Sequence, residues 1–222
     1  IQGNWIEGVP DGEVIFTSRT GNLYKGDFNN GNFNGNGVLT TSLNEQFKGN
    51  FVNGKLHGQG VRIWPNGDQY KGQFDNGLMS GLGEKVFNSE KLYVGNFAND
   101  KFNGEGELTY DNGDNYTGNF LNDNYHGLGL NNWSNGSSWN GEWLHGLPHG
   151  EGTYKYADGT IYIGEMKFNF FDGQGILRFP DGSKYEGEFK NDQYNGKGIL
   201  TTLGEGGYIF KGNFKDGFKE GF

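Results

Sequence analysis

The sequence predicts an all-β protein: an elongated, single-layer, twisted antiparallel sheet made of tandem 23-residue β-hairpins. Three observations support this fold class. A motif recurs every 23 residues, glycine alternates with aromatic residues inside it, and Asn-Gly or Asp-Gly pairs separate its extended segments. No 3.6-residue apolar period is present, and 43 glycines in 222 residues disfavour helices.

The repeat begins with an aromatic residue that is followed by a glycine and a second aromatic residue. "YKGDFNNG" begins at Tyr24, "FKGNFVNG" at Phe47 and "YKGQFDNG" at Tyr70. Later copies begin at residues 93, 116, 139, 162 and 185, the first repeat begins at Ile1, and the last begins two residues late at Phe210. We expect one array over residues 1–222, with nine full repeats and a truncated tenth, and we expect it to be an excerpt of a longer chain because both ends fall inside the pattern.

Numbering each repeat from 1 to 23 shows which residues share a face. Positions 3 and 12 are glycine in all ten repeats, position 14 is glycine in eight of nine, and positions 1 and 5 are aromatic apart from Ile1 and Met166. Side chains alternate along a strand, so positions 1, 3 and 5 lie on one face. We expect the glycines at positions 3, 12 and 14 to leave room for the rings, and a second strand at positions 12–18, as in residues 60–64 and 106–110. Because an isolated hairpin is marginal in water, the hairpins must stack.

The pattern resembles the MORN repeat (membrane occupation and recognition nexus). "YEGEF" at 185–189 and "WNGEW" at 139–143 are similar to its first half, and "NGKLHGQG" at 53–60 is similar to its second half. The sequence departs from it where an acidic or amide residue replaces the turn glycine, at Asp100, Asp123, Asn169 and Asp192. The resemblance implies a half-pipe solenoid with a groove along one face and no catalysis. It also implies adaptor roles in junctional membranes, ciliary radial spokes and cytoskeletal scaffolds, or as an appendage of a lipid kinase or histone methyltransferase.

Composition and spacing give no support for an enzyme or a cofactor site. The formal charge of −9 lacks the basic footprint of nucleic-acid binding, and the absence of cysteine removes disulfides and thiolate metal sites. The histidines keep to repeat positions 11 and 7, which favours turn roles over catalysis or metal binding: His57, His126, His145 and His149. The acidic residues at position 4 are interpreted as a solvated face rather than a catalytic pair: Asp27, Glu142, Glu165 and Glu188.

Position 18 is aromatic only in the middle of the chain. Six consecutive repeats place a ring there: Trp64, Phe87, Tyr110, Trp133, Tyr156 and Phe179. Ser18, Thr41 and Thr202 occupy this position toward the ends. One interpretation is packing between neighbouring strands. The other is an aromatic groove for a partner helix or extended peptide, because grouped exposed aromatic residues mark binding sites.

Three consecutive repeats carry lysine at position 2, namely Lys25, Lys48 and Lys71. Two strand spacings place them about 10 Å apart, close to the Debye length at about 0.1 M salt, so each acts almost alone. Scattered solubilising charge is one interpretation, and contact with anionic phospholipid headgroups is the alternative.

We therefore expect a non-catalytic protein-interaction scaffold, in the cytoplasm, in a cytoskeletal or ciliary assembly of the axonemal or radial-spoke type. The alternatives are a membrane-adjacent phospholipid adaptor and the targeting module of a larger enzyme. Partners are protein segments, with no nucleic acid. Unpaired edge strands at the two ends predict a homodimer or end-to-end association.

Overall fold

The computed structural model describes residues 1–221, which form β-strands joined by turns and contain no helix. Contacts divide the chain into an N-terminal unit, Ile1–Asp111, and a C-terminal unit that starts at Asn112. None of the described residues belongs to a helix of the length and apolarity needed to cross a membrane. The all-β antiparallel fold class is confirmed, whereas the single array over residues 1–222 stays a prediction.

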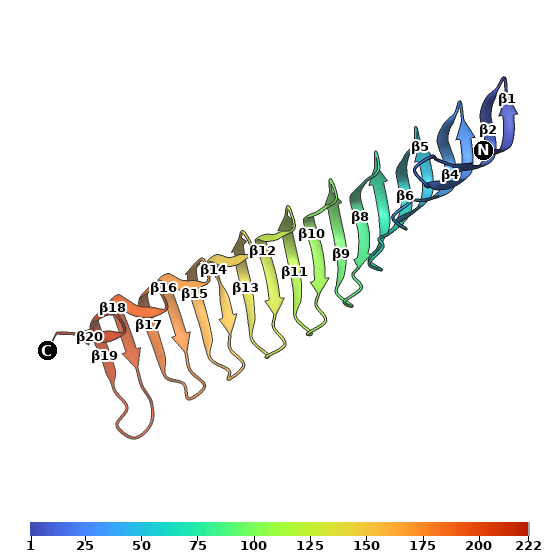
Figure 1. Ribbon diagram of the computed structural model, residues 1–222. Helices are drawn as coiled ribbons and strands as arrows, with labels where there is room; N and C mark the ends of the chain where they lie inside the picture. Colours follow the sequence, from blue (N-terminus) through green and yellow to red (C-terminus); the bar gives the residue numbers. More distant parts are fainter. Residues whose placement is uncertain (222) are drawn as a thin grey trace. The chain divides into compact units, whose positions relative to one another are not determined.

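The N-terminal unit holds ten strands that pair antiparallel in chain order (Figure 1). They are β1 (Gln2–Ile6), β2 (Val9–Thr17), β3 (Leu23–Asn29), β4 (Asn32–Thr40), β5 (Gln46–Val52), β6 (Lys55–Ile63), β7 (Gln69–Asp75), β8 (Leu78–Val86), β9 (Leu92–Ala98) and β10 (Lys101–Thr109).

The C-terminal unit repeats this arrangement with ten more strands among its described residues. They are β11 (Asn115–Leu121), β12 (Asn124–Asn132), β13 (Ser138–Leu144), β14 (Leu147–Lys155), β15 (Ile161–Lys167), β16 (Phe170–Arg178), β17 (Lys184–Lys190), β18 (Gln193–Thr201), β19 (Ile209–Lys215) and β20 (Phe218–Glu220). The last repeat keeps its register although it starts late, because Ile199 still pairs with Lys211.

The second strand of each of the nine full repeats is longer than predicted. It covers repeat positions 9–17, as in β6, rather than 12–18. The reason is the tightness of the hairpin turn: Asn53 and Gly54 have φ of 49° and 80°, so pairing resumes at once between Val52 and Lys55. Two consecutive residues with positive φ are the signature of the turn that fits the twist of a hairpin.

A bulge interrupts each of the nine full hairpins between its two inward-facing pairs. Gly49 pairs with Gly60 and Phe51 pairs with Leu56, which leaves one residue on β5 opposite three on β6. Gly58 lies in the bulge with φ of 75°, and a Cβ on it would meet nothing within 4 Å. The expectation that position 12 makes room for rings is therefore wrong, because its glycine is required by backbone conformation at the bulge.

Glycines at positions 3 and 14 do make room for the core rings. Tyr116 has no exposed surface, and its ring lies over Gly118 and Gly129. A Cβ on Gly118 would lie 2.7 Å from the phenol oxygen of Tyr116, and one on Gly129 would lie 2.6 Å from its Cζ. The ring needs a bare backbone at both places.

The rings also join each repeat to the next. Tyr116 stacks on Tyr125 of its own repeat with centroids 3.6 Å apart, and its edge meets Trp143 of the following repeat at 5.3 Å. Tyr162 does the same with Phe171 at 3.6 Å and Phe189 at 5.2 Å. The core is thus a column of stacked and perpendicular rings on one face of each sheet.

The turns are joined by hydrogen bonds between repeats, including those that lack glycine. The N–H of Gly146 donates to the carbonyl of Tyr125 at 3.0 Å, and the N–H of Asp192 donates to the carbonyl of Phe171 at 3.0 Å. Asp192 adopts φ of 65°, and its Oδ1 accepts a second bond from the N–H of Phe171 at 2.7 Å. At Asp100 and Asp192 the departures from the family pattern therefore keep the turn and add a hydrogen bond.

Candidate interaction surfaces

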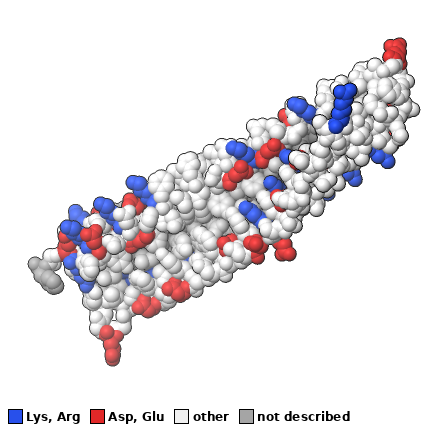
Figure 2. Space-filling model, in the orientation of Figure 1, with Lys and Arg blue, Asp and Glu red and all other residues white. Residues whose placement is uncertain are grey.

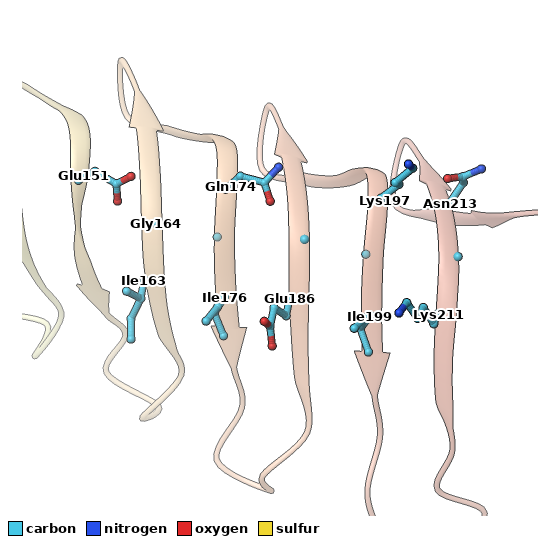
Figure 3. Close-up of a pocket in the computed structure, with 14 residues that line it drawn as sticks. Glu151, Ile163, Gly164, Gln174, Ile176, Glu186, Lys197, Ile199, Lys211 and Asn213 are labelled. Atoms are coloured by element: carbon cyan, nitrogen blue, oxygen red, sulfur yellow. The ribbon is translucent and has the colours of Figure 1, made fainter.

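The face opposite the rings carries the side chains of repeat positions 2, 4, 13 and 15, and we call it the hollow face. In the C-terminal unit a hollow of about 830 Å³ lies on this face over β14–β19 (Figure 3). Its floor is the bare backbone of positions 3 and 14, where a Cβ would point toward the rings and not into the hollow. These residues are Gly164, Gly175, Gly187, Gly198 and Gly212.

Two rows of side chains border this floor. One row carries, in the order of their strands, Ile163, Ile176, Glu186, Ile199 and Lys211, each paired with the next across the sheet. The other row carries Glu151, Gln174, Lys197 and Asn213, and Figure 3 shows the two rows on either side of the glycines. The hollow is open to solvent. One wall carries the three isoleucines, and both walls carry charged side chains.

Three acidic residues of position 4, Asp27, Glu165 and Glu188, have a structural partner that the sequence did not reveal. Asp27 Oδ2 accepts the N–H of Asn36 at 2.9 Å, and Glu188 Oε1 accepts the N–H of Lys197 at 3.2 Å. Both donors stand at position 13, within the bulge and directly before the position-14 glycine. These carboxylates therefore cap the bulge. The interpretation as a merely solvated face was incomplete, because the bulge itself was not predicted.

A second hollow of about 490 Å³ lies on the same face of the N-terminal unit, and its lining includes Lys25 and Lys48 together with Glu13, Asp27 and Val38. Lys71 lies one repeat further on, and valines separate the lysines because Val38 pairs with Lys48 and Val61 pairs with Lys71. All three lysines are exposed, and no ion pair found within residues 1–221 involves them.

The aromatic residues of position 18 lie on the ring face instead. In the N-terminal unit, cations alternate with them. The guanidinium of Arg62 lies 4.4 Å from the Trp64 ring centroid, and Lys85 Nζ lies 4.7 Å from the centroids of both Trp64 and Phe87. Lys91 Nζ lies 4.6 Å from the Tyr110 ring. Sequence reasoning missed these cations, although Arg62 and Lys85 stand two residues before an aromatic position and so share its face.

In the C-terminal unit the stripe packs on other rings. Tyr154 lies 5.5 Å from Trp133 and 4.6 Å from Tyr156. Tyr156 is 39% exposed, and Trp133 and Phe179 are half-buried. Burial raises the pKa of the Tyr156 phenol, with smaller contributions from nearby ionisable groups. The structure thus places the six predicted groove residues on the ring face, where all but Tyr156 are half-buried, and places the hollows on the other face.

The histidines lie beside the turns. His57 Nδ1 is 3.4 Å from Asp75, the rings of His126 and His145 are 6.4 Å apart, and the N–H of Phe168 donates to His149 Nδ1 at 3.4 Å. Within residues 1–221 no three ligating side chains of His, Cys, Asp or Glu come together in a way that could hold a metal ion.

Comparison with protein families identifies the repeat. The family model for the MORN repeat matches residues 24–42, 47–69, 70–90, 93–115, 116–138, 139–161, 162–184, 185–202 and 210–222. No curated protein sequence matches the chain.

The solved structures that match this chain do so at low sequence identity and low TM-score. The TCP domain of Drosophila melanogaster SAS-4 (dCPAP), in complex with a proline-rich motif of Ana2 (dSTIL), is 16% identical with a TM-score of 0.42, and the match covers 71% of this chain and 85% of that one. The G-box domain of the microcephaly protein CPAP is 12% identical with a TM-score of 0.34, and the match covers 92% and 100% of the two chains.

Proposed function

The chain belongs to the MORN repeat family, whose repeats are non-catalytic modules for interaction with proteins and membranes, and from this premise we propose that it is a scaffold in a cytoskeletal or ciliary assembly. It holds segments of partner proteins along the surface of its sheets. The cytoplasm is the compartment in which such an assembly would place it.

The observation that carries this proposal is exposed apolar surface on the hollow face. Leu82 and Val94 are 64% and 46% exposed, and Leu128 and Ile163 are 66% and 40% exposed. All four stand at repeat positions 2 or 13, beside the bare glycine backbone. Figure 2 shows stretches of surface that carry no charged side chain. Exposed apolar side chains are what a partner segment buries on binding.

Cross-linking mass spectrometry on the native assembly tests the proposal, with a Leu128→Asp, Ile163→Asp variant compared with the unchanged chain. We expect cross-links to cytoskeletal or axonemal proteins that the variant loses, because an unpaired charge in a buried contact is costly. A chain that washes out of the detergent-extracted cytoskeleton and yields no protein cross-links contradicts the scaffold.

The aromatic stripe is a second surface for the same function. A Tyr110→Ala, Trp133→Ala variant removes one ring from the stripe in each unit. If partner segments lie on the stripe, this variant loses the cross-links that the hollow-face variant keeps. Unchanged partner recovery with Tyr110→Ala, Trp133→Ala leaves the six rings as packing residues.

A phospholipid adaptor is the second candidate function, favoured by the exposed lysines of β3, β5 and β7. A Lys25→Glu, Lys48→Glu, Lys71→Glu variant would abolish flotation with anionic vesicles at about 0.1 M salt if headgroups bind there. The concave setting of Lys25 and Lys48 suits a chain segment better than a flat bilayer. Absence of flotation by the unchanged protein removes this candidate.

A further inference from the structure

We propose that the hollow of the C-terminal unit binds one extended peptide segment that runs across β14–β19, with basic and apolar side chains over β14–β17 and an acidic group at the β18–β19 end. This inference rests on the scaffold function and adds the chemistry of the partner.

The apolar contact comes from one wall. Ile163, Ile176 and Ile199 stand on β15, β16 and β18 in the same row. Ile163 is 40% exposed, although it stands directly opposite Ile176 on the neighbouring strand. A partner with apolar side chains facing this wall removes that surface from water.

Charge along the hollow has a direction. Glu151 lies on β14 and Glu186 on β17, whereas Lys197 and Lys211 lie on β18 and β19. Further carboxylates on β15 and β17, from Glu165 and Glu188, are fixed at this surface by the bulge N–H groups. Basic side chains are therefore favoured at one end of the bound segment and a carboxylate at the other.

The pairing of Glu186 does not remove it from this role. Its Oε2 lies 3.1 Å from Lys184 Nζ, and the two side chains are 49% and 42% exposed. An exposed ion pair of this kind contributes little to stability, so a cation of the partner can replace Lys184 at small cost.

Dimensions favour an extended segment over a helix. The two rows stand about two residues apart on each strand, roughly 7 Å, which is narrower than the 10–12 Å of a helix with its side chains. From β14 to β19 there are five strand spacings, about 24 Å, which an extended chain covers in about seven residues.

The N-terminal hollow has a different composition and provides the contrast. Lys25 and Lys48 lie beside Val38 in its lining, and the carboxylate of Asp27 is held by the bulge. A segment selected by the charges of the C-terminal hollow would meet lysines there. The two units are therefore expected to prefer different segments.

A displayed library of random linear peptides, selected on the whole chain, tests the inference. We expect an enriched sequence that combines Lys or Arg with apolar residues and carries Asp or Glu at one end. A fluorescent copy of that peptide should lose at least about tenfold in affinity on Glu151→Lys, Glu186→Lys, and its affinity should fall with salt. A second copy with Glu in place of its basic residues should bind this variant more tightly than it binds the unchanged chain.

Glu84→Lys supplies the matched control, because Glu84 is an exposed carboxylate on β8 of the N-terminal unit. It should leave the affinity unchanged. Peptides that bind equally well to Glu151→Lys, Glu186→Lys, or that are lost only with Trp133→Ala, overturn the assignment to the hollow while the scaffold function stands. A selection that enriches no peptide counts against both.

Discussion

In repeat 6, Tyr116 shows how one residue holds several parts of the sheet. Its ring lies flat on two glycines, its face stacks on Tyr125, and its phenol donates to the carbonyl of Asn119 at 2.9 Å. That carbonyl stands at position 4, opposite the bulge. The glycines therefore give the ring the space it occupies, and the phenol supplies a hydrogen-bond donor to a backbone carbonyl at the bulge.

Gly118→Val tests the contact between ring and glycine. Its Cβ would lie 2.7 Å from both the Tyr116 oxygen and the Leu128 carbonyl, so we expect the unfolding free energy to fall by about 3 kcal/mol. Gly127→Ala is the control at position 12. With φ of 63° and its nearest contact at 3.6 Å, it should cost only about 1–2 kcal/mol. Denaturant titration measures both, and equal losses would contradict the different roles of positions 3 and 12.

Buried phenols predict instability in alkali. Desolvation by burial raises the pKa of Tyr24, Tyr70 and Tyr185 to about 12, from an ordinary value of 10.0. Below pH 10 the phenols are neutral in both the folded and the unfolded chain, so their contribution to folding stability is fully present. Between pH 10 and 12 only the unfolded chain loses these protons, so stability falls. We expect the melting temperature to drop across this window, with tyrosinate absorbance appearing on unfolding. Ionisation of Tyr24, Tyr70 and Tyr185 near pH 10 while the protein is still folded would contradict this prediction.

At the scale of the hairpin, the turn side chains join consecutive repeats. Asp192 combines a strained φ with a charge-assisted bond to the Phe171 N–H. Asp192→Ala keeps the strain and loses the bond, so we expect a loss of about 2–3 kcal/mol. Asp192→Asn keeps an acceptor and tolerates this φ, and should lose less than about 1 kcal/mol. Thermal unfolding compares the two, and equal losses would show that the bond contributes nothing.

Hairpins, their phase and the ring contacts with positions 3 and 14 were predictable from the sequence because alternation and turn chemistry act locally. The bulge was not. A glycine at position 12 looks the same in the sequence whether it makes room for a ring or adopts positive φ, as Gly58 does. The resemblance implied a groove along one face, but the residues that line the hollows were not predicted. They depend on how neighbouring strands align positions 2, 4, 13 and 15, whereas the predicted aromatic stripe lies on the other face.

At the scale of the whole chain, stability is a sum over neighbouring repeats. Contacts between rings join one repeat to the next. The ring centroids of Tyr24 and Phe51 are 5.3 Å apart, and those of Tyr70 and Phe97 are 4.8 Å apart. Folding energy in such arrays is close to a nearest-neighbour sum. Loops absorb length changes, since the surplus residues before β19 leave its register intact.

Removing residues 47–69 should therefore leave a folded protein. The deletion takes out β5 and β6 with the following loop, and it brings β7 to β4 with the same repeat positions opposed, because Gly37 faces Gly49 now and would face Gly72 afterwards. We expect retained β-sheet circular dichroism and a cooperative melt at somewhat lower temperature. Removing residues 47–59 instead takes out one strand and half of the next, so every later strand runs in the opposite direction. Gly37 would then face Arg62 in place of Gly49, and rings and glycines no longer match across the strands. If both deletions melt alike, repeat phase is not what specifies this sheet.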